Sequence, residues 1–372
     1  MRVQVGDIVA AMDAWADPAW AESWDNVGLL CGDPEHLVTG VVTALDVTRE
    51  AVEAAAASGA QMIVAHHPLL FRPLSSLAQG TRVTDTLALA QRYGVAVFAA
   101  HTNLDIAPRG VNDMLASRLQ LTRLRGLHMT QRETLYKLAV YVPGTHADRI
   151  RSVLGAEDAG HIGKYSHCSF SVSGEGRFLP EENTHPYIGT AGQTETVAEE
   201  RIETVVTGRR LDKTIAAMMA AHPYEEPAYD IYPLARPGRA VTLGKVGEWE
   251  TPCTGAEALQ RVKERLGIPV LRYAGDTQRT VRTVALCSGS GMEFYREALA
   301  AGADLYVTGD VRYHDAQDAE AEGLLVADGH HFHTEQMIAE GIADYLRDCA
   351  QRNGWQLDVE EDHTRRDVFS FL

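Results

Sequence analysis

A βαβ pattern occurs twice in this sequence, and it constrains the fold more than any other feature. Residues 41–65 and 284–308 each contain an apolar run, a short loop, an Ala-rich helical stretch, a Gly-Ala turn and a second apolar run. In each copy the glycine stands where a helix ends in the left-handed conformation. Two such units predict an α/β fold with a parallel or mixed sheet covered by helices. Sheets of this kind bind ligands just beyond the carboxyl ends of their strands.

The segment between the two copies has a different character. Two strand–helix–strand passes lie within residues 133–234, on either side of a Gly-, Ser-, Thr- and Pro-rich stretch at 160–195. This order is typical of a ferredoxin-like α+β module. We therefore predict a discontinuous first domain, residues 1–128 and 240–372, and an inserted α+β domain at 130–236.

Charge and cysteine content exclude several classes of protein. The formal net charge is −17, which repels phosphate backbones and argues against direct nucleic-acid binding. The five cysteines are odd in number and widely spaced, and no C-x-x-C occurs. This pattern indicates a reducing compartment rather than a disulfide framework. No stretch of about 18 apolar residues and no apolar leader is present, so we expect a cytoplasmic protein without a membrane span.

Two clusters of metal-ligand residues follow apolar strands in the first half of the chain. His66 and His67 end the strand that closes the first βαβ unit. Adjacent imidazoles at a strand end can reach two neighbouring metals, although a pair of loop histidines is the alternative. The second cluster runs from His101 to Asp105, also after a strand. Asp105 offers a hard oxygen ligand and His101 a ligand or an acid/base group; the alternative is an Asx-turn ahead of Pro108.

The third cluster lies near the carboxyl end of the chain. Three histidines and a glutamate occur within six residues after a strand, and His331 and Glu335 are spaced i, i+4. A helical turn would aim these two side chains at one point, where the glutamate could bridge two metals. In one sheet, all three clusters could meet at the same edge. Imidazole with carboxylate suits zinc, iron, manganese, cobalt or nickel, and two metals about 3.5–4 Å apart would activate water near neutral pH.

Other motifs carry weaker signals. A helix follows Ser288, Gly289, Ser290 and Gly291, which could cradle a substrate phosphate or form a plain tight turn. Asp310 and His314 could line the metal site as general bases or supporting groups, or be ordinary surface residues. The stretch from His222 to Pro227 could be a second metal or interface site, but a rigid helix-to-strand corner is favoured. Asp25 and Asn26 could support the site or simply form a turn.

Five blocks, in this order, resemble the Nif-three-like family: SWDNVGLLCGD, IVAHHPLLF, HTNLD, GADLYVTGDVRYHDA and DGHHFHTE. Members of that family are also called GTP cyclohydrolase I type 2 homologues or dinuclear metal centre proteins. The resemblance covers roughly residues 1–125 and 240–372. The middle, with KLAVYVPG, IGKYSHCSF, GEGRFLP and AHPYEEPAYDIYPL, is similar to the insertion of the longer bacterial members, which is related to the CutA and P-II fold.

The resemblance implies two divalent metal ions and a set of ligands: His66, His67, Asp105, His331 and Glu335. The family usually reads Asp-x-Gly-His where this chain reads Asp-Gly-His-His. Alignment on the Gly-His pair would select His330, but the helical spacing to Glu335 favours His331. A hexameric toroid with metal sites facing an internal cavity is also implied.

Two functions are therefore expected. The first is a metal-dependent hydrolase of a nucleotide-like or phosphorylated small molecule, with His101, Asp310 or His314 in proton transfer and residues 288–291 in substrate binding. The alternative is a regulatory or metal-handling scaffold in which the inserted domain binds a ligand.

Overall fold

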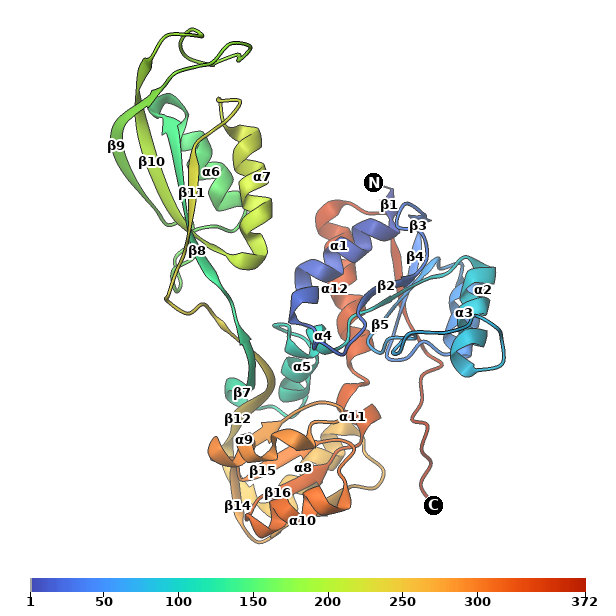
Figure 1. Ribbon diagram of the computed structural model, residues 1–372. Helices are drawn as coiled ribbons and strands as arrows, with labels where there is room; N and C mark the ends of the chain where they lie inside the picture. The colour runs from blue at the N-terminus through green and yellow to red at the C-terminus, as the bar shows by residue number, and fades with distance from the viewer. Residues whose placement is uncertain (1) are drawn as a thin grey trace. The chain divides into compact units, whose positions relative to one another are not determined.

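The computed structural model describes residues 2–372, which divide into two compact units (Figure 1). Unit 1 contains the residues up to 130 together with 241–372, and unit 2 contains residues 131–240. Among the described residues, no helix is both long and apolar enough to cross a membrane.

The first sheet of unit 1 has five strands in the order β17-β4-β5-β6-β2. Neighbouring strands are parallel except at β2, which pairs antiparallel with β6. All residues of β5 and β6 are buried, which explains their unbroken apolar sequence. The strands are β2 (Gly28–Cys31), β4 (Gly40–Ala44), β5 (Met62–Ala65), β6 (Ala96–Ala99) and β17 (Asp358–Glu361).

Helices cover both faces of this sheet (Figure 1). On one face, Ile8 and Met12 of α1 and Leu346 of α12 pack against Val64 and Phe98. On the other face, α2 and α3 pack against alternate strand residues such as Ile63 and Val97. This alternation is the period-two pattern of a strand. The helices are α1 (Val5–Trp15), α2 (Arg49–Ser58), α3 (Arg82–Tyr93) and α12 (Ile338–Asn353).

The second sheet of unit 1 has six strands in the order β13-β16-β15-β14-β12-β7. Its centre, β14-β15-β16, is parallel. Helices α5 and α8 contribute to the core on one face, and α9 and α10 to the core on the other. The elements are β7 (Thr122–Arg132), β12 (Ala240–Thr254), β13 (Arg272–Ala274), β14 (Thr280–Leu286), β15 (Leu305–Thr308), β16 (Leu325–Asp328), α5 (Val111–Arg118), α8 (Gly255–Leu266), α9 (Tyr295–Ala300) and α10 (Tyr313–Ala321).

The two βαβ copies lie in separate sheets, so the expectation of one sheet is wrong. Residues 41–65 form β4-α2-β5 in the first sheet, and residues 284–308 form β14-α9-β15 in the second. Both β5 and β15 already have a parallel neighbour on each side. The closing strands of the two copies are therefore inner strands of two different sheets.

Unit 2 contains two strand–helix–strand passes. Its sheet is antiparallel throughout, in the order β11-β8-β10-β9. Apolar residues of α6 and α7, such as Ile150 and Met218, pack against Leu138, Val140 and Ile202. The elements are β8 (Leu135–Pro143), α6 (Ala147–Ala156), β9 (Ser169–Phe178), β10 (Glu195–Thr207), α7 (Leu211–Ala221) and β11 (Tyr229–Pro233).

Candidate metal centre

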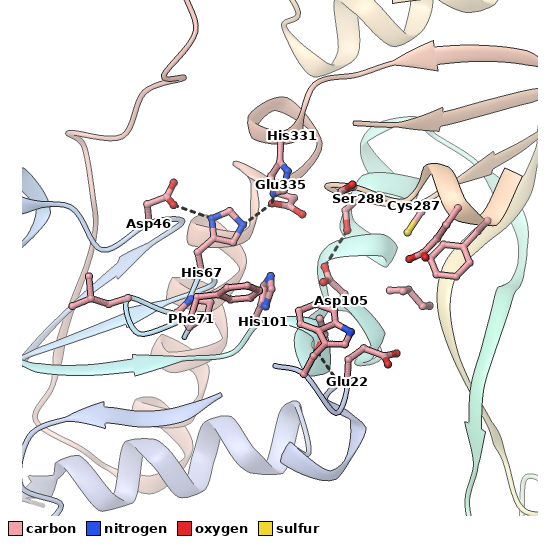
Figure 2. Close-up of a pocket in the computed structure, with 18 of the residues that line it drawn as sticks. Glu22, Asp46, His67, Phe71, His101, Asp105, Cys287, Ser288, His331 and Glu335 are labelled. Carbon is pink, nitrogen blue, oxygen red and sulfur yellow. Dashed lines mark hydrogen bonds and ion pairs between the residues drawn. The ribbon is translucent and has the colours of Figure 1, made fainter. Parts of the chain in front are cut away.

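Polar residues that follow strands of both sheets of unit 1 gather in one place (Figure 2). His66 and His67 follow β5, and His101 follows β6 at the start of the short helix α4 (Thr102–Ile106). From the second sheet, the short helix α11 (His331–Glu335) follows β16. Its i, i+4 pair is in contact, with His331 Nε2 lying 3.1 Å from Glu335 Oε2.

His66 has a ring nitrogen that nothing in the described chain satisfies. The side chain is fully buried, and Nδ1 donates a hydrogen bond to the carbonyl oxygen of Ala100 at 2.8 Å. Burial lowers the pKa of His66 to about 3, so the ring is neutral and Nε2 carries a lone pair. Within residues 2–372 this Nε2 has no hydrogen-bond partner. It faces Asp105 Oδ1 at 3.6 Å and Glu335 Oε1 at 4.0 Å, an arrangement that a cation would satisfy.

His67 and His331 share the other oxygen of Glu335. His67 Nε2 lies 3.0 Å from Glu335 Oε2, and its Nδ1 lies 2.9 Å from Asp46 Oδ1. His331 Nδ1 lies 2.7 Å from Asp310 Oδ2. Burial lowers the pKa of both rings, but the carboxylates outweigh it and raise the pKa to about 10 for His67 and about 11 for His331. Without metal, both rings are therefore protonated at neutral pH.

The buried carboxyl groups of Asp105 and Glu335 have pKa values shifted in opposite directions. Burial, and then the negative charge of Glu335, raise the pKa of Asp105 well above its usual range. Burial opposes the ionisation of Glu335, but the charges and hydrogen bonds of His331 and His67 hold its pKa well below the usual range. Ser288 Oγ also donates a hydrogen bond to Asp105 Oδ1 at 3.0 Å. Such a pair favours a cation between the two groups.

His101 is oriented by Asp25. His101 Nδ1 lies 2.8 Å from Asp25 Oδ1, and Asp25 also accepts hydrogen bonds from the backbone and side chain of Thr102. Although burial raises the pKa of Asp25, these bonds lower it to about 2. The His101 ring centroid lies 5.2 Å from that of His66 and 5.5 Å from that of His67.

Three sets of side chains could each hold a metal ion, because within each set the ligand atoms lie within 4.8 Å of one another. In all four histidines involved, Nδ1 contacts an oxygen acceptor, as is usual for metal-binding histidines. The Nε2 atoms of His67 and His331 point to the shared carboxylate of Glu335. Two of the sets share Glu335, so one carboxylate could bridge two ions. The sets are His66, Asp105 and Glu335; His67, His331 and Glu335; and His66, His67 and His101.

A cavity of about 750 Å³ opens onto these residues (Figure 2). Its volume is that of a pocket for a small molecule. Trp24 and Phe71 form part of its apolar wall, with ring centroids 5.8 Å apart, and Phe294 also lines it. Arg82 contributes a positive charge to the lining.

Residues 3–367 match the family model described as Duf34/NIF3 (NGG1p interacting factor 3). This chain belongs to the Duf34/NIF3 family. The family resemblance drawn from the sequence is therefore confirmed.

Members of the Duf34/NIF3 family resemble this chain over its full length. A protein of Halalkalibacterium halodurans named "GTP cyclohydrolase 1 type 2 homolog" is 40% identical over 373 residues, which cover 100% of both chains. A Bacillus subtilis protein of the same name is 37% identical and covers 98% of each chain. The crystal structure of a Bacillus cereus protein related to NIF3 matches with a TM-score of 0.92 at 37% identity, over 99% of each chain.

The five residues expected as metal ligands from the family resemblance all belong to the three ligand sets described above. Of the two adjacent histidines at 330 and 331, these sets contain His331 and not His330. His330 has a positive φ of 58° and its Nε2 donates to the carbonyl oxygen of Val270 at 2.8 Å. His333 Nδ1 likewise donates to a carbonyl oxygen, that of Leu266, at 3.2 Å. The helical spacing therefore identifies the histidine that faces Glu335.

Asp310 and His314, two of the candidates for proton transfer, differ in their relation to the ligand group. Among the described residues, His314 is not part of the cavity lining, because it lies exposed on α10 and its ring packs against Tyr313. Asp310 Oδ2 lies 2.7 Å from the Nδ1 of His331, so it orients that ring, and it also lines a second cavity together with His67 and His331.

Most backbone amides of the expected phosphate cradle, Ser288, Gly289, Ser290 and Gly291, already have partners within the protein. Three of the four backbone amides already donate within the protein, those of residues 288, 289 and 291, to side-chain oxygens of Asn112, Thr334 and Thr308. The following helix is a short 3-10 turn, Met292–Phe294, before α9. The tight-turn alternative fits this geometry. Ser288 and Ser290 line the cavity, but the Ser288 hydroxyl already donates to Asp105.

Asp46 was missed by the sequence reasoning. It stands two residues after β4, and its carboxylate binds the Nδ1 of His67. Its position just past a buried strand, like that of His66 after β5, is the signal that could have identified it.

Proposed function

We propose that this protein holds two divalent metal ions and is a metal-dependent hydrolase of a nucleotide-like or phosphorylated small molecule. The observation that carries the proposal is the buried, unpartnered Nε2 of His66 beside the carboxylates of Asp105 and Glu335. Imidazole and carboxylate ligands suit zinc, iron, manganese, cobalt or nickel.

Glu335, which belongs to two of the ligand sets, would help to hold both ions. His66 and Asp105 would complete one ligand set, and His67 and His331 the other. When bound, two such ions supply Lewis acidity and lower the pKa of water towards neutrality. The supporting carboxylates Asp46 and Asp310 hold the His67 and His331 rings in position.

Residues of the cavity would bind the substrate and move the proton. His101, fixed by Asp25, is the candidate for proton transfer because it lines the cavity beside the two ligand sets that share Glu335. Trp24 and Phe71 offer an apolar wall for a planar ring, and Arg82 a cation for a phosphate. The name of the relatives, GTP cyclohydrolase 1 type 2 homolog, supports a purine nucleotide as the first substrate to test.

Elemental analysis of protein purified without added metal tests the centre. We expect two equivalents per chain, and a loss of metal in His67→Ala. We also expect the metal-loaded protein to turn over GTP or a phosphoester and Glu335→Ala to abolish that turnover. Full folding with no metal bound would refute the centre, and turnover unaffected by Glu335→Ala would refute the hydrolase.

We further propose a cytoplasmic homohexamer, which rests on the family resemblance and is tested by measuring the native mass. A regulatory or metal-handling scaffold is the second candidate function. The strand order β11-β8-β10-β9 supports a ferredoxin-like, P-II/CutA-like unit 2, and a separate cavity within that unit supports ligand binding there.

A further inference from the structure

The tripeptide His-Pro-Tyr occurs twice in unit 2. Residues 185–187 lie in the loop between β9 and β10, and residues 222–224 directly follow α7. The fold brings the two copies together: the ring centroids of Tyr187 and Tyr224 are 6.4 Å apart. The amide of His185 also donates to Glu225 Oε1 at 3.0 Å, which ties the loop to the corner after α7.

His222 acts as a structural part of this corner. Its Nε2 donates to the carbonyl oxygen of Tyr141 at 3.0 Å, and its Nδ1 accepts from the amide of Tyr224 at 3.1 Å. Because both ring nitrogens are used by the backbone, the favoured interpretation of a rigid helix-to-strand corner fits this residue. The consequence is that the Tyr224 ring is held in place.

Both tyrosines line a cavity of about 670 Å³. Phe178 adds a third ring, with its centroid 5.9 Å from that of Tyr224. The planes of Phe178 and Tyr187 are inclined to that of Tyr224 by 59° and 48°. Three rings around one cavity, two of them inclined to the third, offer both aromatic faces and edges to a ligand, as an aromatic cage does.

The charges around this cavity are mostly negative. The Tyr224 hydroxyl donates to Glu199 Oε1 at 2.8 Å, so a carboxylate stands directly beside the rings. Arg177 is the one basic side chain among the described lining residues, and it lies 3.8 Å from Glu175 at the exposed rim. The carboxylates that line the cavity are those of Glu175, Glu181, Glu199, Glu225 and Glu226.

We propose that this cavity binds a small organic cation of the alkylammonium class. Aromatic faces attract a cation through their quadrupole, the carboxylates balance its charge, and the rings and aliphatic lining shield its alkyl groups from water. The same charges would repel a nucleotide or another anion. The proposal names the ligand class for the second candidate function and does not depend on the metal centre.

Calorimetric titration of the full-length protein with choline tests the proposal. The uncharged isostere 3,3-dimethylbutan-1-ol serves as the matched ligand, because it has the same shape without the charge. We expect saturable binding of one choline per chain and at least about tenfold weaker binding of the alcohol. Absence of saturable binding, or equal binding of both compounds, would overturn the proposal.

Variants locate the binding site. Tyr187→Leu and Tyr224→Leu are each expected to weaken choline binding about tenfold. Tyr187 lies 55% exposed in a loop, so its replacement leaves the core intact. Tyr165→Leu is the control, since Tyr165 is 75% exposed and is not among the described residues that line the cavity. Unchanged affinity in Tyr187→Leu would refute this site, whereas Glu335→Ala should leave choline affinity unchanged even if the hydrolase proposal fails.

Discussion

Single atoms decide the chemistry of the candidate metal centre. A buried polar atom without a partner costs about 1–3 kcal/mol, and His66 Nε2 is such an atom at a site with two carboxylates nearby. The surrounding rings are each held at Nδ1, so Nε2 is directed rather than free to rotate. Side chains fixed in this way are prepared to bind an ion without further ordering.

Asp46 is expected to strengthen metal binding through His67. Asp46→Asn keeps the side-chain shape but removes the negative charge that polarises the ring, so metal affinity should fall about 10–100-fold. Asp344→Asn is a matched control on the exposed face of α12, where Asp344 pairs with Arg347. Competition with a fluorescent chelator measures both variants. Equal affinities would contradict the role given to Asp46.

The metal-free protein should become less stable as the pH rises. The pKa of His67 is raised from 6.5 to about 10 in the folded state, so its contribution to stability is complete below pH 6.5 and lost as the pH passes through about 10. Chelator-treated protein should therefore melt at least about 2–4 °C lower at pH 10 than at pH 7. His67→Gln, measured in the same way, corrects for other groups and should show a smaller decrease. A melting temperature that is flat or rising with pH would contradict this expectation.

The protons on the His67 and His331 rings also oppose metal binding. Because His67 and His331 must lose their protons to bind an ion, the apparent metal affinity should rise with pH over this range. The two effects have opposite signs, so stability with and without metal should diverge as the pH increases.

Among the elements, the loop after β14 comes unusually close to α11. Gly289 has φ +58°, and a Cβ on it would lie 2.3 Å from Glu335 Oε1. The glycine therefore allows the second sheet to hold the shared carboxylate where both ligand sets need it. Any larger residue must displace either the loop or Glu335.

Gly289→Ala should lower both the amount of bound metal and the stability of the protein. Gly302→Ala is the matched control, because Gly302 also has a positive φ, +77°, but a Cβ there meets nothing among the described residues within 4 Å. Both variants should be destabilised by the left-handed backbone conformation, by about 1–2 kcal/mol. Only Gly289→Ala should lose bound metal by elemental analysis, and equal metal content in the two would contradict the close approach.

The residues that gather at the candidate metal centre could be found from the sequence, but not all of the groups that support them. Adjacent imidazoles and an i, i+4 His–Glu pair are distinctive wherever they follow a buried strand, so His66, His67, His331 and Glu335 could be identified. A single aspartate such as Asp46 is common after a strand. Whether it reaches a histidine depends on contacts between segments that the local pattern does not encode.

At the scale of the whole molecule, the sequence predicted α/β elements and an insertion between the two repeats. It could not predict how many sheets they form, because an apolar strand pattern does not specify the partner of a strand. In the structure β5 pairs with β4 and β6, and β15 pairs with β14 and β16. This strand pairing is determined by packing between segments that are distant in the sequence.

Removal of unit 2 should leave the metal centre intact. All three candidate ligand sets lie in unit 1. The Thr130 hydroxyl donates to the carbonyl oxygen of Val241 at 3.2 Å, so the cut ends at 130 and 241 are adjacent. A variant with residues 131–240 replaced by Asn-Gly should close as a hairpin and bind as much metal per chain as the full protein. Loss of metal in a folded variant would show that unit 2 is needed for the centre.

The shared carboxylate of Glu335 has one mechanical consequence. His67 and Glu335 are 268 residues apart in the chain and come from different sheets. Ions held between them would tie the two sheets together as a cross-link does, and would restrict the unfolded chain by closing a very long loop. Amide hydrogens of both sheets should then exchange together, in a single opening event, while the ions are bound. A chelator would release that constraint and let the two sheets open one at a time.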